Sequence, residues 1–187
     1  MSATIARRLL LSTLLVAAVA LFAAACGGDD EQSGGGGSSG NAAAGAKCGA
    51  VTEGDKSLVR HCGDASGEIT IDGKKTEFDE GQCQNTNTSI VLNLGANLMS
   101  ANPTEADYDK YTYMGVLAGK HPAATPDAPA VSKDGTFTEG VLVSAVANGK
   151  PIALTTAELR LSDDRSKGEF TGESVNGEKI SGSFDCG

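Results

Sequence analysis

Cysteines and histidines are the side chains of this sequence whose types could do nucleophilic or metal chemistry. The chain has five cysteines and two histidines. His61 directly precedes Cys62, a pair that could bind a metal or act as base and nucleophile. His121 precedes Pro122 in a proline-rich stretch, which is typical of a solvated loop residue. Because the chain begins with an export signal and exported cysteines form disulfides, we expect Cys62 to be oxidised and predict no catalytic or metal-binding residue.

Acidic pairs are the second group of candidates for chemistry. Asp79-Glu80 and Asp163-Asp164 place carboxylates side by side in turn-like sequence. A glycosidase instead needs two acids about 5–9.5 Å apart across a sugar cleft, and adjacency in sequence does not supply that. The Asx-Gly dipeptides lack the spacing of a calcium loop, and neither S-x-x-K nor a phosphate-binding loop is present. The sequence therefore predicts a protein that is not an enzyme and uses no cofactor.

The N-terminal residues point to export and to a modified cysteine. Arg7-Arg8 precede the uncharged run Leu9–Ala25, a pattern typical of a secretory signal peptide, here residues 1–25. Ala23-Ala24-Ala25-Cys26 resembles a bacterial lipobox, although alanine replaces the favoured leucine at its first position. The resemblance implies a diacylglycerol thioether on Cys26, palmitate-type acylation and cleavage before this residue. The alternative is an ordinary signal peptide cleaved after Ala25, which leaves Cys26 as a free thiol.

Residues 26–46 form the predicted tether. They are rich in Gly, Ser and Ala, and their charged residues are Asp29, Asp30 and Glu31. Such a composition cannot bury a core and behaves as a flexible chain of about 25 Å root-mean-square reach. Without basic residues the anchor must come from acyl chains, and two chains suffice. We expect the protein on the extracytoplasmic side of the cell membrane, with the lipid bilayer as its partner.

Charge excludes one class of partner. The formal net charge is −9, and loss of Arg7 and Arg8 with the signal peptide changes it to about −11. Nucleic-acid binding depends on neutralising phosphates, so this acidic chain is not expected to bind DNA or RNA. Residues 47–187 remain as one domain of modest size, which we expect to be monomeric.

That domain is predicted to be mainly β, an antiparallel sandwich or open barrel with one short helix. The dipeptides Asp72-Gly73, Asn148-Gly149 and Asn176-Gly177 each separate short runs of β-type residues, a strong hairpin signal. The expected strands lie within residues 68–78, 89–94, 111–117, 140–146, 151–162, 169–172 and 179–186. For the helix we expect Asn102 as the cap, Pro103 in the first position and an end near Lys110.

Disulfides are expected because the core is light: the chain has five Phe, three Tyr and no Trp. Apart from Cys26, four cysteines remain, and four allow three connectivities. Period-2 alternation places Cys186 on the inward face with Ile180 and Phe184. We pair Cys83 with Cys186, which joins the early sheet to the last strand, and Cys48 with Cys62, which closes a short N-terminal loop.

The domain resembles the mycobacterial nineteen-kilodalton lipoprotein antigen family, also found in other actinobacteria. The resemblance lies in the lipobox, the tether, Ile69-Thr-Ile-Asp-Gly73, Asn97–Pro103, Gly115–Gly119 and the ending Ile180–Cys186, and it covers about 120 residues. It implies a surface lipoprotein of the cell envelope with one domain disulfide, matching Cys83–Cys186, and no enzymatic activity. Cys48 and Cys62 depart from the family pattern.

Two functions remain open at this stage. The first is a non-catalytic envelope domain that presents a surface, with a host or cell-wall component as its partner. The second is a carrier that holds a lipid or another apolar ligand inside the β domain, lined by the runs Ile90–Leu94 and Val141–Val146. A carrier needs a cavity, and pockets for small ligands are typically about 300–1,000 Å³. The same runs would also serve to fill a core.

Overall fold

The computed structural model describes residues 48–100 and 102–187, and these form the unit Cys48–Gly187. The predicted signal peptide, Cys26 and the tether lie outside the described residues. The elements in chain order are β1 (Gly49–Glu53), β2 (Lys56–His61), β3 (Ser66–Ile71), β4 (Lys74–Phe78), β5 (Gly81–Asn85), β6 (Ser89–Leu98), α2 (Glu105–Lys110), β7 (Tyr113–Gly119), β8 (Gly135–Phe137), β9 (Val141–Ala147), β10 (Lys150–Ser162), β11 (Lys167–Ser174) and β12 (Lys179–Asp185).

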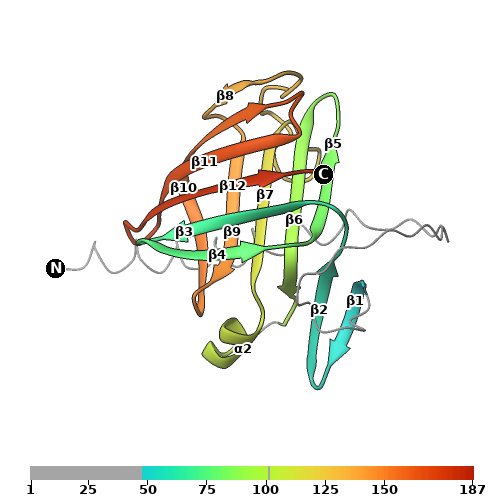
Figure 1. Ribbon diagram of the computed structural model, residues 1–187, viewed down its shortest axis with the longest axis vertical. Helices are drawn as coiled ribbons and strands as arrows, with labels where there is room; N and C mark the ends of the chain where they lie inside the picture. Colours follow the sequence, from blue (N-terminus) through green and yellow to red (C-terminus); the bar gives the residue numbers. More distant parts are fainter. Residues whose placement is uncertain (1–47, 101) are drawn as a thin grey trace. The chain divides into compact units, whose positions relative to one another are not determined.

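The strands form one antiparallel sheet that folds back on itself. Its order is β1-β2-β6-β7-β9-β10-β11-β12-β3-β4, with β5 paired to β6 and β8 paired to β10. We call the part from β1 to the start of β10, together with β5, sheet A, and the part from the end of β10 to β4, together with β8, sheet B. Figure 1 shows the strands of sheet B crossing in front of β6, β7 and β9. The prediction of a mainly β, open antiparallel architecture with one short helix is confirmed.

Strand β10 makes the corner between the two layers. Its first residues pair with β9 up to Ala153, and the rest pair with β11 from Leu154 onward. The register shifts between Leu154 and Thr156, the irregularity that bends a strand and lets it change layers. The sequence analysis considered residues 151–156 and 157–162 separately, and the structure joins them in one strand across the bend.

The core lies between the two layers. Ile90, Leu92 and Leu94 of β6 are fully buried in it, as the predicted alternation requires. From sheet B, Ile69, Phe170 and Phe184 pack into the same cluster. Glycines make room for the aromatic rings: a Cβ on Gly168 would overlap the ring of Phe184, and one on Gly182 would overlap Phe170. Fully burying each such apolar side chain contributes about 1.5–3 kcal/mol.

The helix begins two residues later than predicted. Thr104 is its N-cap, and Asn102 is exposed outside the helix. The Asp107 carboxylate accepts hydrogen bonds from the backbone N–H of Thr104 at 2.7 Å and from its hydroxyl at 2.8 Å. Lys56, from β2, lies 3.1 Å from the same carboxylate. Both Asn and Thr can cap a helix, and this contact with a distant strand is not visible in the local sequence. The predicted end at Lys110 is confirmed.

Candidate functional site

The cysteines are the predicted site residues that the structure places directly. Cys48 bonds to Cys62 and Cys83 bonds to Cys186, with Cα–Cα distances of 5.8 and 5.3 Å. These are the two pairs expected from the sequence. The first closes the hairpin of β1 and β2, and the second joins β5 of sheet A to the residue after β12 of sheet B. Cys26, the predicted lipidation site, lies outside the described residues.

The two histidines are not brought together with a nucleophile. Cys62, next to His61, has its sulfur in a disulfide, so it offers no thiolate. His61 is buried, and this burial lowers its pKa. His121 lies in the segment after β7, where its backbone N–H bonds to the carbonyl oxygen of Thr125. Within residues 48–100 and 102–187, no three histidine, cysteine or carboxylate side chains are grouped closely enough to hold a metal ion.

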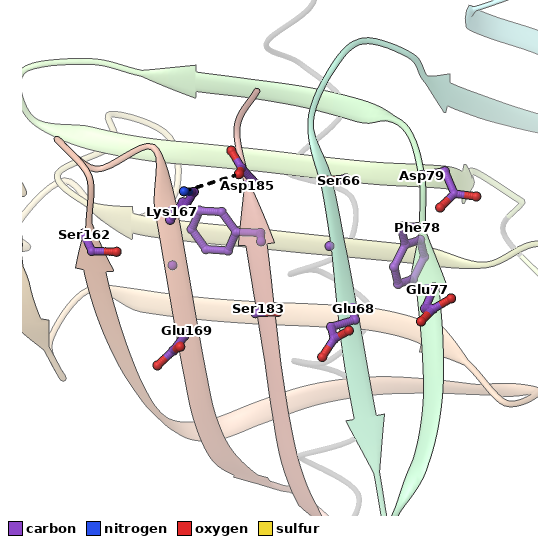
Figure 2. Close-up of a pocket in the computed structure, with 13 residues that line it drawn as sticks. Ser66, Glu68, Glu77, Phe78, Asp79, Ser162, Lys167, Glu169, Ser183 and Asp185 are labelled. Carbon is purple, nitrogen blue, oxygen red and sulfur yellow. Dashed lines mark ion pairs between the residues drawn. The ribbon is translucent and has the colours of Figure 1, made fainter. Parts of the chain in front are cut away.

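A polar groove crosses the outer side of sheet B. Its volume is about 560 Å³, and its floor includes Gly67 and Gly168. The groove is bordered by Ser66, Glu68, Glu77, Asp79, Ser162, Lys167, Glu169, Ser183 and Asp185. Phe78 and Phe184 also belong to its lining, although both residues are buried in the core cluster. Figure 2 shows Glu68, Glu77 and Glu169 on three strands with their carboxylates on this side. Five of its lining residues are acidic: Glu68, Glu77, Asp79, Glu169 and Asp185.

Lysines neutralise part of that acidity. Lys75 Nζ lies 2.5 Å from Glu68 Oε2 and 2.8 Å from Glu77 Oε1. Glu68 and then Glu77 raise the pKa of Lys75, and Lys75 in turn lowers the pKa of Glu77. A carboxylate with a lowered pKa stays ionised at neutral pH, so Glu77 is poorly suited to act as a general acid. The Glu68, Glu77 and Lys75 side chains therefore form a charged cluster at this edge of the groove.

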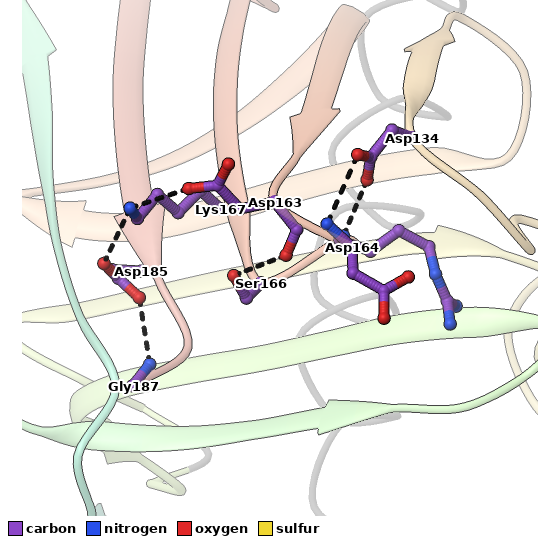
Figure 3. A network of polar contacts seen from close by, with 8 residues as sticks. Asp134, Asp163, Asp164, Ser166, Lys167, Asp185 and Gly187 are labelled. Atoms are coloured by element: carbon purple, nitrogen blue, oxygen red, sulfur yellow. Dashed lines mark hydrogen bonds and ion pairs between the residues drawn. The ribbon is translucent and has the colours of Figure 1, made fainter.

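The turn between β10 and β11 has an unusual backbone. Asp163, Asp164 and Arg165 all have positive φ, at 56°, 57° and 64°. Successive left-handed residues turn their N–H groups toward one side and form a concave anion-binding nest. Here the anion is the Asp134 carboxylate, which accepts from the N–H of Arg165 at 2.7 Å and from that of Asp164 at 3.2 Å (Figure 3). The nest is thus already occupied by a side chain of the protein.

The same turn is tied to both layers. Arg165 donates from Nη1 to the carbonyl oxygens of Thr86 at 2.5 Å and Val131 at 3.0 Å. On the other side, Lys167 lies 2.8 Å from Asp163 and 3.9 Å from Asp185, as Figure 3 shows. These hydrogen bonds and ion pairs hold the backbone of the turn in its left-handed conformation, which would otherwise be unfavourable for residues other than glycine.

The sequence analysis missed a group of polar side chains on sheet A. Tyr113 is 1% exposed, and its hydroxyl donates to Asn93 Oδ1 at 2.6 Å. Burial raises the pKa of Tyr113, while the neighbouring Ser144 hydroxyl acts weakly in the opposite direction. The Tyr113 ring lies 5.9 Å from the ring of His61. The one available signal was the presence of Asn93 and Ser144 inside otherwise apolar strands.

Comparisons of the chain with models of protein families, with curated proteins and with solved structures found no match. Among the described residues, no helix is both long and apolar enough to cross a membrane.

Proposed function

We propose that the protein is a bacterial envelope lipoprotein, held on the extracytoplasmic side of the cell membrane by acyl chains on Cys26. Residues 48–187 would be a non-catalytic domain displayed beyond the tether. One observation carries the proposal. The sequence has five cysteines, and four of them pair as Cys48–Cys62 and Cys83–Cys186, which leaves Cys26 for another use.

The lipobox-like sequence before Cys26 supports lipidation over a spare thiol. The disulfides support export, because disulfides persist in oxidising compartments and are rare in the cytosol. The described domain begins at Cys48, which leaves the predicted tether of residues 26–46 between the proposed anchor and the domain. This arrangement also agrees with the resemblance to the mycobacterial nineteen-kilodalton antigen family, which we retain as part of the proposal.

The charged exterior of sheet B favours a displayed surface over a chemical site. Its carboxylates alternate with lysines, and those of Glu68 and Glu77 share Lys75. Exposed pairs of this kind contribute little to stability, with measured values of about 0–1 kcal/mol. They keep the protein soluble and set which charged components of an envelope or host surface can approach it.

The alternative, a carrier with its ligand between the sheets, has less support. The side chains of both layers meet in one cluster, in which Ile69, Leu92 and Met114 are all 0% exposed. A ligand there would have to displace packed side chains, and interiors of this density respond to even one added methylene. The groove on sheet B is open and polar rather than apolar.

Cys26→Ser tests the proposal in a bacterial host that processes lipoproteins. The wild-type protein should sediment with membranes, incorporate labelled palmitate and give an N-terminal peptide with the mass of diacylated Cys26. Cys26→Ser should lose the label and the membrane association while keeping its fold. Cys48→Ala/Cys62→Ala is the matched control, because it removes two other sulfurs and should remain labelled. A wild-type protein recovered from the soluble fraction with a free Cys26 thiol would contradict the proposal.

A further inference from the structure

The two disulfides differ in how easily an external thiol can reach them. Cys48 is exposed, whereas Cys83 and Cys186 are partly buried and pack against the main core cluster. The backbone beside the second bond is also fixed, because the N–H of Cys186 donates to the carbonyl oxygen of Ser166 at 2.7 Å. A thiolate must approach a sulfur atom before it can break a disulfide, so access limits the rate. The bond of Cys48 to Cys62 is therefore the one that an external thiol reaches first.

The exposed bond closes the open end of a hairpin that little else holds. Strand β1 lies at one end of the strand order and pairs with β2 (Figure 1). No residue of β1 is buried. Val51 packs partly against the small cluster around Leu58 and Tyr111, which is separate from the main core. Segments with few buried apolar contacts and an exposed backbone open locally at a low cost in free energy.

Polar contacts hold the other end of the hairpin, where β1 meets its turn. Glu53 pairs with Arg60 and accepts a hydrogen bond from the Tyr111 hydroxyl at 3.0 Å. Lys110 Nζ lies 3.5 Å from the same carboxylate. The hairpin is thus fastened twice, by the disulfide at its open end and by Glu53 near its turn. Breaking the disulfide leaves β1 free to separate from β2 from its first residue inward, while Glu53 keeps the turn in place.

The short separation of the two cysteines allows the same bond to form again. Cys48 and Cys62 are 14 residues apart, against 103 for Cys83 and Cys186. The entropic cost of bringing two points of a chain together rises with the length of the loop between them. As long as the contacts of Glu53 preserve the turn, the two thiols stay close to each other after reduction. A bond with these properties can open and close while the rest of the domain stays folded.

We propose that Cys48–Cys62 is a site of thiol–disulfide exchange, which an external dithiol opens while Cys83–Cys186 stays intact. One thiolate of the dithiol attacks the Cys48 sulfur, and the electron pair of the broken S–S bond goes to the Cys62 sulfur, which takes a proton from water. The second thiolate of the dithiol then attacks the mixed disulfide and releases the Cys48 thiolate, which is protonated in turn. The dithiol is oxidised to a disulfide, the domain gains two thiols, and β1 separates from β2. The exchange concerns the domain alone and does not depend on acylation of Cys26.

The test of selectivity uses the mature chain with Cys26→Ser and both disulfides formed, so that no other thiol takes part. Dithiothreitol is the probe, added to the folded protein without denaturant. Samples taken over time are blocked with iodoacetamide, and peptide mass spectrometry measures the alkylation of each cysteine. We expect Cys48 and Cys62 to be alkylated at least tenfold faster than Cys83 and Cys186. Circular dichroism of the same samples should stay that of the folded domain.

Hydrogen exchange measures what the reduction releases. In the selectively reduced protein, the amides of β1 should exchange at least tenfold faster than in the oxidised protein, and those of β6 and β7 should be unchanged. Cys48→Ala/Cys62→Ala should show the same pattern without reductant, which excludes an effect of the reagent. Glu53→Gln weakens the second fastening and should raise the exchange of β1 further in the reduced protein. The matched control Glu139→Gln changes an exposed carboxylate outside the hairpin and should have no effect on β1.

Three results would overturn the proposal. The first is reduction of Cys83–Cys186 as fast as that of Cys48–Cys62. The second is a protein in which neither bond is reduced until circular dichroism shows that the domain has unfolded. The third is a reduced protein whose β1 amides exchange as slowly as those of the oxidised protein, because the bond would then be accessible without controlling the hairpin. Membrane release of Cys26→Ser is measured separately, so failure here and failure of the anchor proposal are distinguishable.

Discussion

Removing the disulfide Cys83–Cys186 should destabilise the domain more than removing Cys48–Cys62. The matched perturbations are Cys83→Ala/Cys186→Ala and Cys48→Ala/Cys62→Ala, each of which deletes two sulfur atoms. The bonded cysteines are 103 residues apart in the first case and 14 in the second. A cross-link restricts the unfolded chain more when it closes a longer loop. The two variants therefore test whether the entropy of the unfolded chain determines how much stability each disulfide contributes.

The sequence separations give the expected magnitudes. The chain-entropy relation predicts losses of about 4.7 kcal/mol for the loop closed by Cys83–Cys186 and about 3 kcal/mol for the loop closed by Cys48–Cys62. The difference is about 1.8 kcal/mol. The positions of the two bonds in the fold also predict a larger loss of stability for Cys83–Cys186. Cys48–Cys62 fastens the edge hairpin of β1 and β2, which can open without the rest of the domain.

Equilibrium urea unfolding of residues 26–187 carrying Cys26→Ser measures both losses. With a slope of about 2 kcal/mol per molar urea, the midpoints of the two variants should differ by about 0.9 M, with the Cys83→Ala/Cys186→Ala variant lower. The slopes must be compared as well, since a change in slope reports a change in the unfolded state. Equal midpoints, or a lower midpoint for the Cys48→Ala/Cys62→Ala variant, would refute the entropy argument.

Two further predictions concern a buried histidine and a turn. Burial lowers the pKa of His61 below its usual 6.5. As the pH falls, the unfolded chain therefore binds a proton at His61 before the folded chain does. The free energy of unfolding should decrease as the pH drops through 6.5. His61→Gln should flatten that part of the pH profile in thermal unfolding, and an unchanged slope would refute the assignment. Asp134→Ala removes the acceptor for the N–H groups of Asp164 and Arg165 and should cost about 1 kcal/mol, whereas the control Asp127→Ala should leave the melting temperature unchanged.

Local turn chemistry made much of the fold predictable. At Asp72-Gly73 and Asn148-Gly149 both residues have positive φ, the conformation that two-residue hairpins require and that these residue types tolerate. Asn176-Gly177 also joins two paired strands, but there only the glycine is left-handed. The hairpins were therefore predictable, although the turn type at the third was not.

Strands that depend on distant partners were not predictable. β5 has the sequence Gly-Gln-Cys-Gln-Asn, with no apolar alternation, and is held by its pairing with β6 and by the Cys83 disulfide. β8 has three residues and exists through its pairing with β10. The hairpin of β1 and β2 was also missed, because its apolar residues pack in a separate small cluster around Leu58 and Tyr111.

The facing of the residues in β6 and β7 was only partly predictable, for a different reason. Period-2 alternation identifies a buried face by contrast with a polar one, and it correctly placed Ile90, Leu92 and Leu94 in the core. In β6 and β7 nearly every residue is shielded on both sides, so the contrast disappears. The sequence of β6 reads as one apolar run around Asn93. Such a run indicates burial but does not say which residues face the core and which face away from it.

The Cys48–Cys62 bond also has a mechanical consequence for the proposed anchored form. A tether attached to a bilayer would transmit tension to the domain at its first described residue, Cys48. Strand β1 begins at the next residue and pairs with β2 at the end of the sheet, so tension along it would separate the two strands one hydrogen-bonded pair at a time. The disulfide carries the load past β1 to Cys62, directly after β2. Strand β2 is in turn paired with β6, whose side chains lie in the core. In the proposed anchored form, this bond would reinforce the point where the tether joins the domain.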